Sequence, residues 1–209
     1  MIIQPDTETL LAVVLGAALA TAGGFSERQL ERAIHRREKQ RSAALLFGEL
    51  LNSMRIILQF ADQARGRGDP YGPITLRLVR ATRREAEIYD RNRETLLELR
   101  NPDLRARITT LVTRLAFSLD GVTDAAAEVV ATQYSVRALD RADPGRTEAE
   151  QHIAALRETQ KAAFDFALET VTEIPQLLAA LTPLAEHNFG VAEAMAPAAP
   201  PAAATPRQS

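Results

Sequence analysis

The stretch TLLAVVLGAALATAGGFSERQLERAIHRREKQR, residues 9–41, joins seventeen uncharged residues to a dense run of bases. Such a stretch has three interpretations: a transmembrane helix, a cleaved export signal, or a buried helix of a soluble domain. An export signal needs bases ahead of its apolar core and few after it. Here Asp6 and Glu8 precede the core, and the bases follow it. A helix of a soluble domain shows a polar face, which residues 9–25 lack. We therefore favour a transmembrane helix over residues 9–25.

This segment is short for a bilayer. Seventeen residues rise roughly 25 Å, against about 30 Å of hydrocarbon, and a thinned bilayer or flanking arginines can absorb the difference. Its large apolar residues favour insertion by roughly 2–4 kcal/mol in total, so one aspartate at its centre, at about 2.5–3.5 kcal/mol, is expected to abolish insertion. The bases after the segment indicate the cytoplasmic side. We expect an inner-membrane protein with residues 1–8 outside and the C-terminal domain in the cytoplasm.

Small residues recur at every fourth position of this segment and share one helix face, where they allow a second helix to approach closely. The pattern favours self-association in the membrane, but an alanine-rich chain also produces it by composition alone. These residues are Ala12, Gly16, Ala20 and Gly24.

A charged juxtamembrane stalk is predicted over residues 26–41. Its bases either hold the stalk against anionic lipid, at about 1 kcal/mol per base, or only set the orientation of the membrane helix. Three acidic residues dilute them, which argues against recognition of a particular lipid. The bases are Arg28, Arg32, Arg36, Arg37, Lys39 and Arg41.

The composition indicates an all-helical protein. Alanine and leucine dominate the apolar residues, which make up 46% of the chain, and aromatic residues make up only 5%. Both dominant residues propagate helices well, whereas sheets prefer β-branched and aromatic residues. The chain has no cysteine, which excludes disulfides and thiolate metal sites. A net charge of −2 without a basic face bearing aromatic residues argues against nucleic-acid binding.

Four long helices are predicted beyond the membrane segment. The clearest has an apolar stripe at helical spacing from Ala43 to Ala61. A loop rich in glycine and proline follows at residues 65–73. The third helix of the chain, counting the membrane helix as the first, is followed by Asn101-Pro102, which ends it. The predicted ranges are 26–64 (restarting at the capping sequence of Ser26), 75–100, 103–141, and 147–181 with a kink at Pro175.

Short connections favour antiparallel neighbours, so the expected fold is one N-terminal transmembrane helix followed by an elongated antiparallel bundle of about four long helices. The bundle spans residues 42–190, and the Ala/Pro-rich residues 191–209 are predicted to be a disordered tail. Asp120-Gly121 is a turn signal inside the 103–141 helix, but the apolar phase continues across it, and we favour an unbroken helix. Narrow apolar stripes on long helices are also typical of coiled coils, so a homo-oligomer is possible.

One polar group interrupts the apolar stripe of the 75–100 helix. Glu85, Tyr89 and Asn92 fall on its inward positions. They either fix helix register as a buried cluster, line a ligand cleft, or mark a stripe that drifts to the surface. His35 and His152 each follow a glutamate four residues earlier, a spacing that suits solvated pairs better than a metal site. We expect no metal and no cofactor.

No catalytic motif occurs in the chain. The sequence favours a single-pass, membrane-anchored interaction or scaffold protein whose partners are the lipid bilayer and an unknown protein. The alternative is a helical-bundle enzyme or ligand-binding protein with a polar cleft on the third helix.

Overall fold

The computed structural model describes the backbone of residues 7–138 and 143–190, and side chains from residue 31 onward except at 138 and 144. Residues 191–209, predicted to be a disordered tail, lie outside these ranges. All regular structure in these ranges is helical, as the composition predicts. The elements are α1 (Thr7–Arg65), α2 (Pro73–Arg91), the 3₁₀ helix η1 (Arg93–Glu98), α3 (Pro102–Ala138), α4 (Pro144–Val171) and α5 (Ile174–Ala185).

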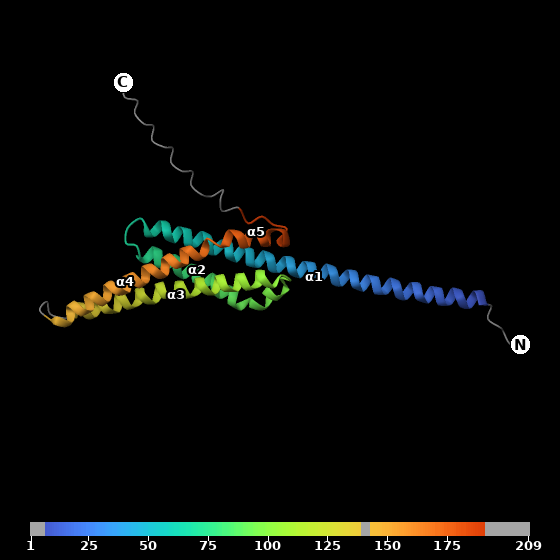
Figure 1. Cartoon of the computed structure of the whole chain (residues 1–209), viewed down its shortest axis with the longest axis horizontal. Coiled ribbons are helices and arrows are strands. Elements are labelled where there is room, and N and C mark those ends of the chain that lie inside the picture. The colour runs from blue at the N-terminus through green and yellow to red at the C-terminus, as the bar shows by residue number, and fades with distance from the viewer. Residues whose placement is uncertain (1–6, 139–142, 191–209) are drawn as a thin grey trace, which may run out of the picture.

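Helix α1 runs without interruption for 59 residues (Figure 1). The predicted restart at Ser26 is therefore wrong. Glycine is tolerated inside a helix at a cost of about 1 kcal/mol each, so Gly23 and Gly24 weaken this part of α1 without ending it. In Figure 1 the amino-terminal part of α1 projects beyond the other helices, and its carboxyl-terminal part lies among them.

The helices form a bundle around one main core (Figure 1). α1 packs on α2 and α5, and the most extensive contact joins α3 to α4. The predicted stripe on α1 is the buried face, because its large members are almost fully removed from solvent. These are Phe47, Leu51, Met54 and Leu58.

The helix predicted over 75–100 is shorter than expected. α2 ends at Arg91, and η1 replaces its last turns. The Nδ2 of Asn92 donates a hydrogen bond to the Ile88 carbonyl at 2.8 Å, and Asn92 leaves helical geometry at φ −107° and ψ 15°. Asparagine side chains compete with the backbone in this way, which explains the early end. The change turns the chain so that η1 lies against α1.

Helix α3 continues through Gly121, as the unbroken apolar phase favours. A Cβ at Gly121 would lie 3.4 Å from the Cβ of Ala163, so this glycine marks a close approach of α3 to α4. By contrast, the helix predicted over 147–181 is interrupted. α4 ends at Val171 and α5 begins at Ile174, because Pro175 has no N–H to continue the bonds of α4 and fits the first turn of α5.

Three arginines join helices that are distant in sequence. Arg83 Nε lies 2.7 Å from Asp120 Oδ1 and links α2 to α3. That hydrogen bond raises the pKa of Arg83 above its ordinary value, against the opposing effect of burial. Arg65 links α1 to Asp165 of α4 at 2.5 Å. Arg114 links α3 to Glu173, between α4 and α5, at 2.7 Å.

The segment after α5 is fixed to α1 by an aromatic ring. Phe189 is buried, and its ring lies directly against Gly48, so that a Cβ at Gly48 would overlap the ring. Arg41 of α1 supports the same contact, because its Nε donates to the Ala185 carbonyl at 3.3 Å and its Nη1 lies 3.5 Å from Glu186. Arg41 also places a positive charge at the carboxyl terminus of α5, where the helix dipole is negative.

Replacing Gly48 by alanine is expected to destabilise the fold by about 1–3 kcal/mol, because the Phe189 ring must move. In a Phe189→Ala chain the same replacement is expected to stabilise by up to about 1 kcal/mol, because alanine has the higher helix propensity. Urea unfolding of the four chains, followed by circular dichroism in mild detergent, measures both effects. If Gly48→Ala changed the stability with the same sign in the original chain and in the Phe189→Ala chain, the close contact between Gly48 and the Phe189 ring would not explain its effect.

Candidate functional site

Of the three residues predicted to form a polar cluster, Tyr89 is the one that joins two helices. It is 3% exposed, and its ring meets Phe47 of α1 edge-on with centroids 5.8 Å apart. The Tyr89 hydroxyl donates a hydrogen bond to Thr109 Oγ1 of α3 at 2.9 Å. The Thr109 hydroxyl in turn donates to the Arg105 carbonyl at 2.9 Å. Tyr89 therefore connects α2 to α3 through a satisfied pair of hydrogen bonds.

The other two residues of the predicted cluster do not share these bonds. Asn92 is half-buried and donates to Ile88 within its own helix. Glu85 is half-buried, and no hydrogen bond or ion pair to it is found among the described residues. The structure thus places the three side chains along one part of α2 without joining them to one another.

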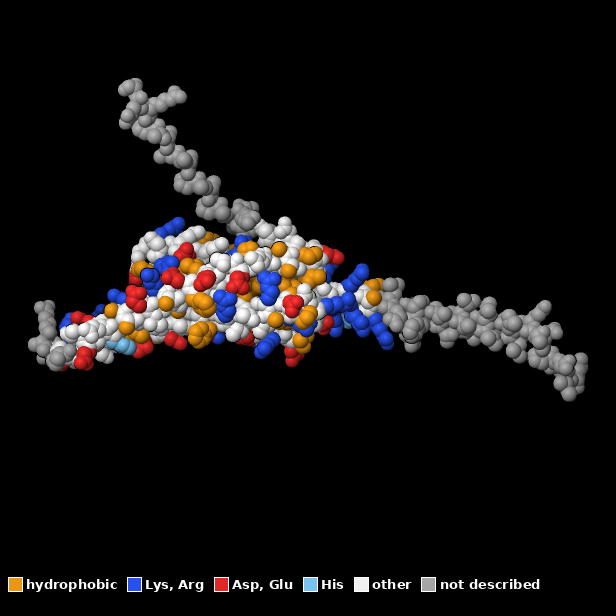
Figure 2. All heavy atoms as spheres, in the orientation of Figure 1, with side chains coloured by type: hydrophobic (Ala, Val, Ile, Leu, Met, Phe, Trp, Pro, Cys, Tyr) orange, Lys and Arg blue, Asp and Glu red, His pale blue; other side chains and the backbone are white. Residues whose placement is uncertain are grey.

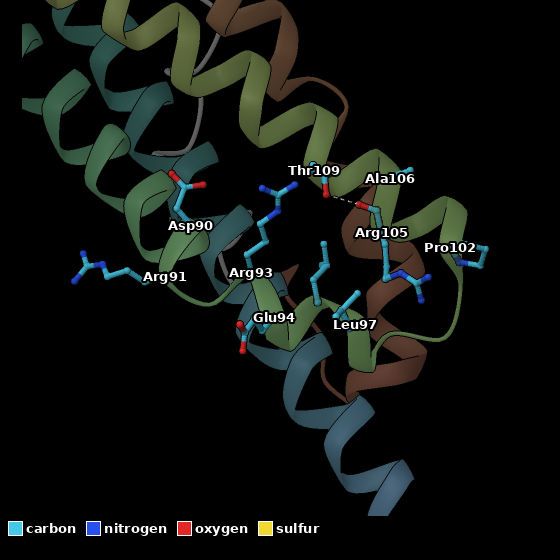
Figure 3. A pocket seen from close by; sticks show the side chains of 10 residues that line it. Asp90, Arg91, Arg93, Glu94, Leu97, Pro102, Arg105, Ala106 and Thr109 are labelled. Carbon is cyan, nitrogen blue, oxygen red and sulfur yellow. Dashed lines mark hydrogen bonds between the residues drawn. The ribbon is translucent and has the colours of Figure 1, made fainter.

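A groove of about 640 Å³ lies beside Tyr89, between the end of α2, η1 and the start of α3 (Figure 3). Its wall combines apolar side chains with arginines and carboxylates. Thr109, which accepts the bond from Tyr89, is one of the lining residues. In Figure 3, Arg93 extends across the groove toward Thr109, whereas Arg91 points away from it. The apolar lining comes from Leu96, Leu97, Pro102 and Ala106.

The arginines of this groove have different roles. Arg105 donates from Nη1 to the Leu99 carbonyl at 2.6 Å and so holds the turn between η1 and α3. Arg93 is exposed, and no ion pair to it is found among the described residues. Leu97 is 71% exposed at the rim. The guanidinium of Arg93 and the exposed carbon of Leu97 therefore lie in one groove, together with the carboxylates of Asp90 and Glu94.

The described part of the basic stalk is exposed over residues 31–39. Figure 2 shows blue side chains gathered where the bundle narrows to α1. Arg32, Arg36 and Arg37 are exposed. Lys39 is exposed but lies 3.7 Å from Glu98 of η1, and Arg41 is engaged with the end of α5. Two of the predicted bases, Lys39 and Arg41, therefore contact the bundle, and three others are exposed. The side chain of Arg28 lies outside the described residues.

The small residues Ala12, Gly16, Ala20 and Gly24 lie within the helical backbone of α1, but their side chains are outside the described part. Within the part of α1 whose side chains are described, Glu31–Arg65 is long and apolar enough to cross a membrane by length and composition. In the most apolar 18 residues of this stretch, 44% of the residues are buried inside the protein. Because this stretch supplies the core of the bundle, burial in protein already accounts for its apolar character.

The histidines contact different glutamates from those that the sequence spacing indicates. His35 Nδ1 lies 4.0 Å from Glu38, and His152 Nε2 lies 3.0 Å from Glu128 of α3. No cluster of three or more histidines and carboxylates is found in the described part of the chain.

Comparison with protein-family models, with curated proteins and with solved structures finds no match to this chain.

Sequence reasoning located the polar part of α2 but missed the groove beside it. The groove exists because the chain leaves α2 at Asn92 and returns at Pro102 through η1. Asparagine followed ten residues later by proline was the available signal, since both residues favour a helix boundary. The contact between Lys39 and Glu98 has no sequence signal, because the two residues lie on separate elements.

Replacing Tyr89 by phenylalanine is expected to destabilise the fold by about 0.5–1.5 kcal/mol, because the hydrogen bond between α2 and α3 is lost. The matched control is Glu85→Gln on the same helix, for which a change below about 0.5 kcal/mol is expected. Urea unfolding measures both. An equal loss in the two variants would mean that the Tyr89–Thr109 bond contributes nothing specific.

Proposed function

We propose that the chain is a single-pass membrane protein whose cytoplasmic helical bundle acts as an interaction or scaffold module. The observation that carries this proposal is the continuity of α1. The uncharged residues 9–25 and the core face that begins at Ala43 belong to one helix, so a bilayer around the first part would hold the bundle directly. A rigid connection of this kind transmits position and orientation better than a flexible linker.

The stalk between these two parts has the dimensions of a spacer. From Phe25 to Ala43 a helix rises about 27 Å, and Arg32 lies about 10 Å beyond Phe25. The headgroup layer is about 5–8 Å thick on each side of the hydrocarbon. Helical side chains lean toward the amino terminus of the helix, which in the proposed orientation is toward the bilayer. Arg28 and Arg32 would then meet the headgroups, while Arg36 and Arg37 lie above them.

The proposed scaffold is an elongated antiparallel bundle built mainly from α1, α2, α3 and α4. Support comes from the short connections at residues 66–72 and 92–101, which favour antiparallel neighbours. It also comes from the large apolar side chains that remain exposed on the bundle, which are suited to contact with a protein partner. They include Phe60, Ile74, Phe117 and Tyr134.

Replacing Gly16 by aspartate is expected to release the full chain from membranes, because a central aspartate costs about 2.5–3.5 kcal/mol against a total insertion energy of roughly 2–4 kcal/mol. Gly16→Leu, the matched control, is expected to stay in the membrane. Carbonate extraction of membranes followed by immunoblotting measures the distribution. Release of the unmodified chain, or retention of the aspartate variant to the same extent as the control, would refute the anchor.

The groove at η1 favours a second candidate function, a ligand-binding protein. Its volume of about 640 Å³ lies within the range of small-molecule sites, and it combines apolar walls with an arginine that has no ion-pair partner among the described residues. The groove lies next to the polar region on which the sequence predicts a cleft, but Glu85, Tyr89 and Asn92 do not line it. We infer an amphiphilic ligand whose anionic group meets Arg93, in a lining that also contains the carboxylates of Asp90 and Glu94.

The dye 8-anilinonaphthalene-1-sulfonate, an amphiphilic anion, is expected to bind this groove. Reversing the charge with Arg93→Glu is expected to weaken its binding about tenfold at low salt, and Arg84→Glu, an exposed position elsewhere on α2, is expected to leave it unchanged. Fluorescence titration measures both dissociation constants. Equal weakening by both changes would indicate general electrostatic attraction and no site.

A further inference from the structure

The hairpin of α3 and α4 contributes to two separate hydrophobic clusters. The main core reaches Val122 on α3 and Phe164 on α4, and the outer cluster contains Val129, Val136 and Ile153. Figure 1 shows the outer ends of these two helices projecting past the connection between α1 and α2. A boundary between the two clusters therefore crosses the hairpin.

A cavity of about 430 Å³ lies at this boundary. Its walls come from the α1–α2 connection, the start of α2, the middle of α3, and α4. We call it the Gln160 cavity, after the one polar residue of its lining that is almost fully buried. It shares no lining residue with the groove at η1. The largely apolar part of its lining is Pro70, Tyr71, Leu76, Ala126, Val129 and Val130.

Gln160 is a buried amide whose hydrogen bonds are incomplete. It is 3% exposed, and its Nε2 donates to the Val122 carbonyl over a long 3.4 Å. Its Oε1 has no hydrogen-bond partner among the described residues. In that part of the chain the side-chain atoms that lack both a partner and access to solvent are Arg55 Nε and Arg83 Nη1, so Gln160 Oε1 is still accessible, through the cavity that Gln160 lines. An amide oxygen in a mainly apolar site costs free energy unless a donor meets it.

The wall that the α1–α2 connection supplies is held in place. The Tyr71 ring packs edge-on against Phe164 of α4 with centroids 6.2 Å apart, and the Tyr71 N–H donates to Asp69 Oδ1 at 3.2 Å. Burial raises the pKa of Tyr71 above its ordinary value, against the opposing effect of Arg65, so its hydroxyl is uncharged at neutral pH. These contacts fix the wall before any ligand binds, as is usual for small-molecule sites.

The charges of the lining balance each other. Asp69 and Arg157 contribute one charge of each sign, and both side chains are exposed. The remaining polar lining residues besides Tyr71 are the neutral amides Gln133 and Gln160. An ion in the cavity would be attracted by one of the two charged side chains and repelled by the other. The lining therefore favours an uncharged ligand.

We propose that the Gln160 cavity binds a small, uncharged, mainly apolar molecule that donates one hydrogen bond to Gln160 Oε1. The donor is an N–H or O–H group, and the apolar body of the ligand lies against Leu76, Val129 and Val130. The volume falls in the lower part of the range of small-molecule sites, about 300–1,000 Å³. Because such a ligand touches the α1–α2 connection, α3 and α4 together, its binding holds the hairpin to the main core.

Indole has this chemistry, and 1-methylindole lacks only its N–H donor. The chain has no cysteine, so Val130→Cys in the full chain, in dodecyl maltoside, reports occupancy through its rate of reaction with N-ethylmaleimide. Position 130 lines the cavity and is 50% exposed. Saturating indole is expected to slow this reaction by at least about threefold, because the bound probe covers the thiol. Phe117→Cys, at a position 78% exposed on the same helix, is expected to react at an unchanged rate.

The role of Gln160 is measured by the ratio of the dissociation constants of 1-methylindole and indole. In the Val130→Cys chain this ratio is expected to be about two- to tenfold higher than in the same chain with Gln160→Leu, because leucine accepts no hydrogen bond. Comparing ratios in one detergent removes the effect of probe partition into micelles. Gln151→Leu, exposed on α4 and outside the lining, is the matched control and is expected to leave the ratio unchanged.

Circular dichroism checks that each variant folds, and Gln160→Met, which also lacks the acceptor, repeats the test if the leucine variant does not. Equal slowing at positions 130 and 117 would indicate general partition of the probes, and no slowing at position 130 would mean that the cavity takes no such ligand. Either result would overturn the proposal. A ratio that Gln160→Leu leaves unchanged, or that Gln151→Leu lowers equally, would overturn it as well.

Discussion

The structure depends on one constraint, the continuity of α1 across 59 residues. Its second half supplies a fully apolar face to the core, with Phe47, Leu51, Met54 and Leu58 all buried. α2, η1, α4 and α5 all pack on α1. Because the same helix continues toward the uncharged residues 9–25, any surface that holds those residues also sets the position of the bundle.

The end of the bundle from which α1 projects is organised by contacts between the basic stalk and the other elements. Lys39 meets Glu98 of η1, and Arg41 meets the carboxyl end of α5. These bases belong to the fold, whereas Arg32, Arg36 and Arg37 remain exposed. Part of the positive charge of this stretch is therefore engaged within the fold, and part of it remains exposed. The Phe189 ring packs on Gly48 and fixes the chain after α5 to α1.

The opposite end differs in character. There, α3 and α4 pack on each other and form a small cluster of their own. Pairs of helices that project from a core gain little burial, and their stability rests on local helix propensity and on links such as His152 to Glu128.

The sequence by itself determined that the chain is helical and that the face from Ala43 to Ala61 is a core face, because periodicity reports burial directly. It favoured an unbroken helix through Gly121 without deciding it, and the structure shows α3 continuous there. It located Tyr89 on the inward face of its helix but could not identify Thr109 as its partner. It predicted one kinked helix where Pro175 separates two, and it carried α2 past Asn92. Only the tertiary structure decided which bases of the stalk are paired, that Glu85, Tyr89 and Asn92 do not form one cluster, and where the groove lies. These three features depend on contacts between elements far apart in the chain. The spacing of apolar residues along a helix indicates which face is buried, but it does not indicate which element covers that face.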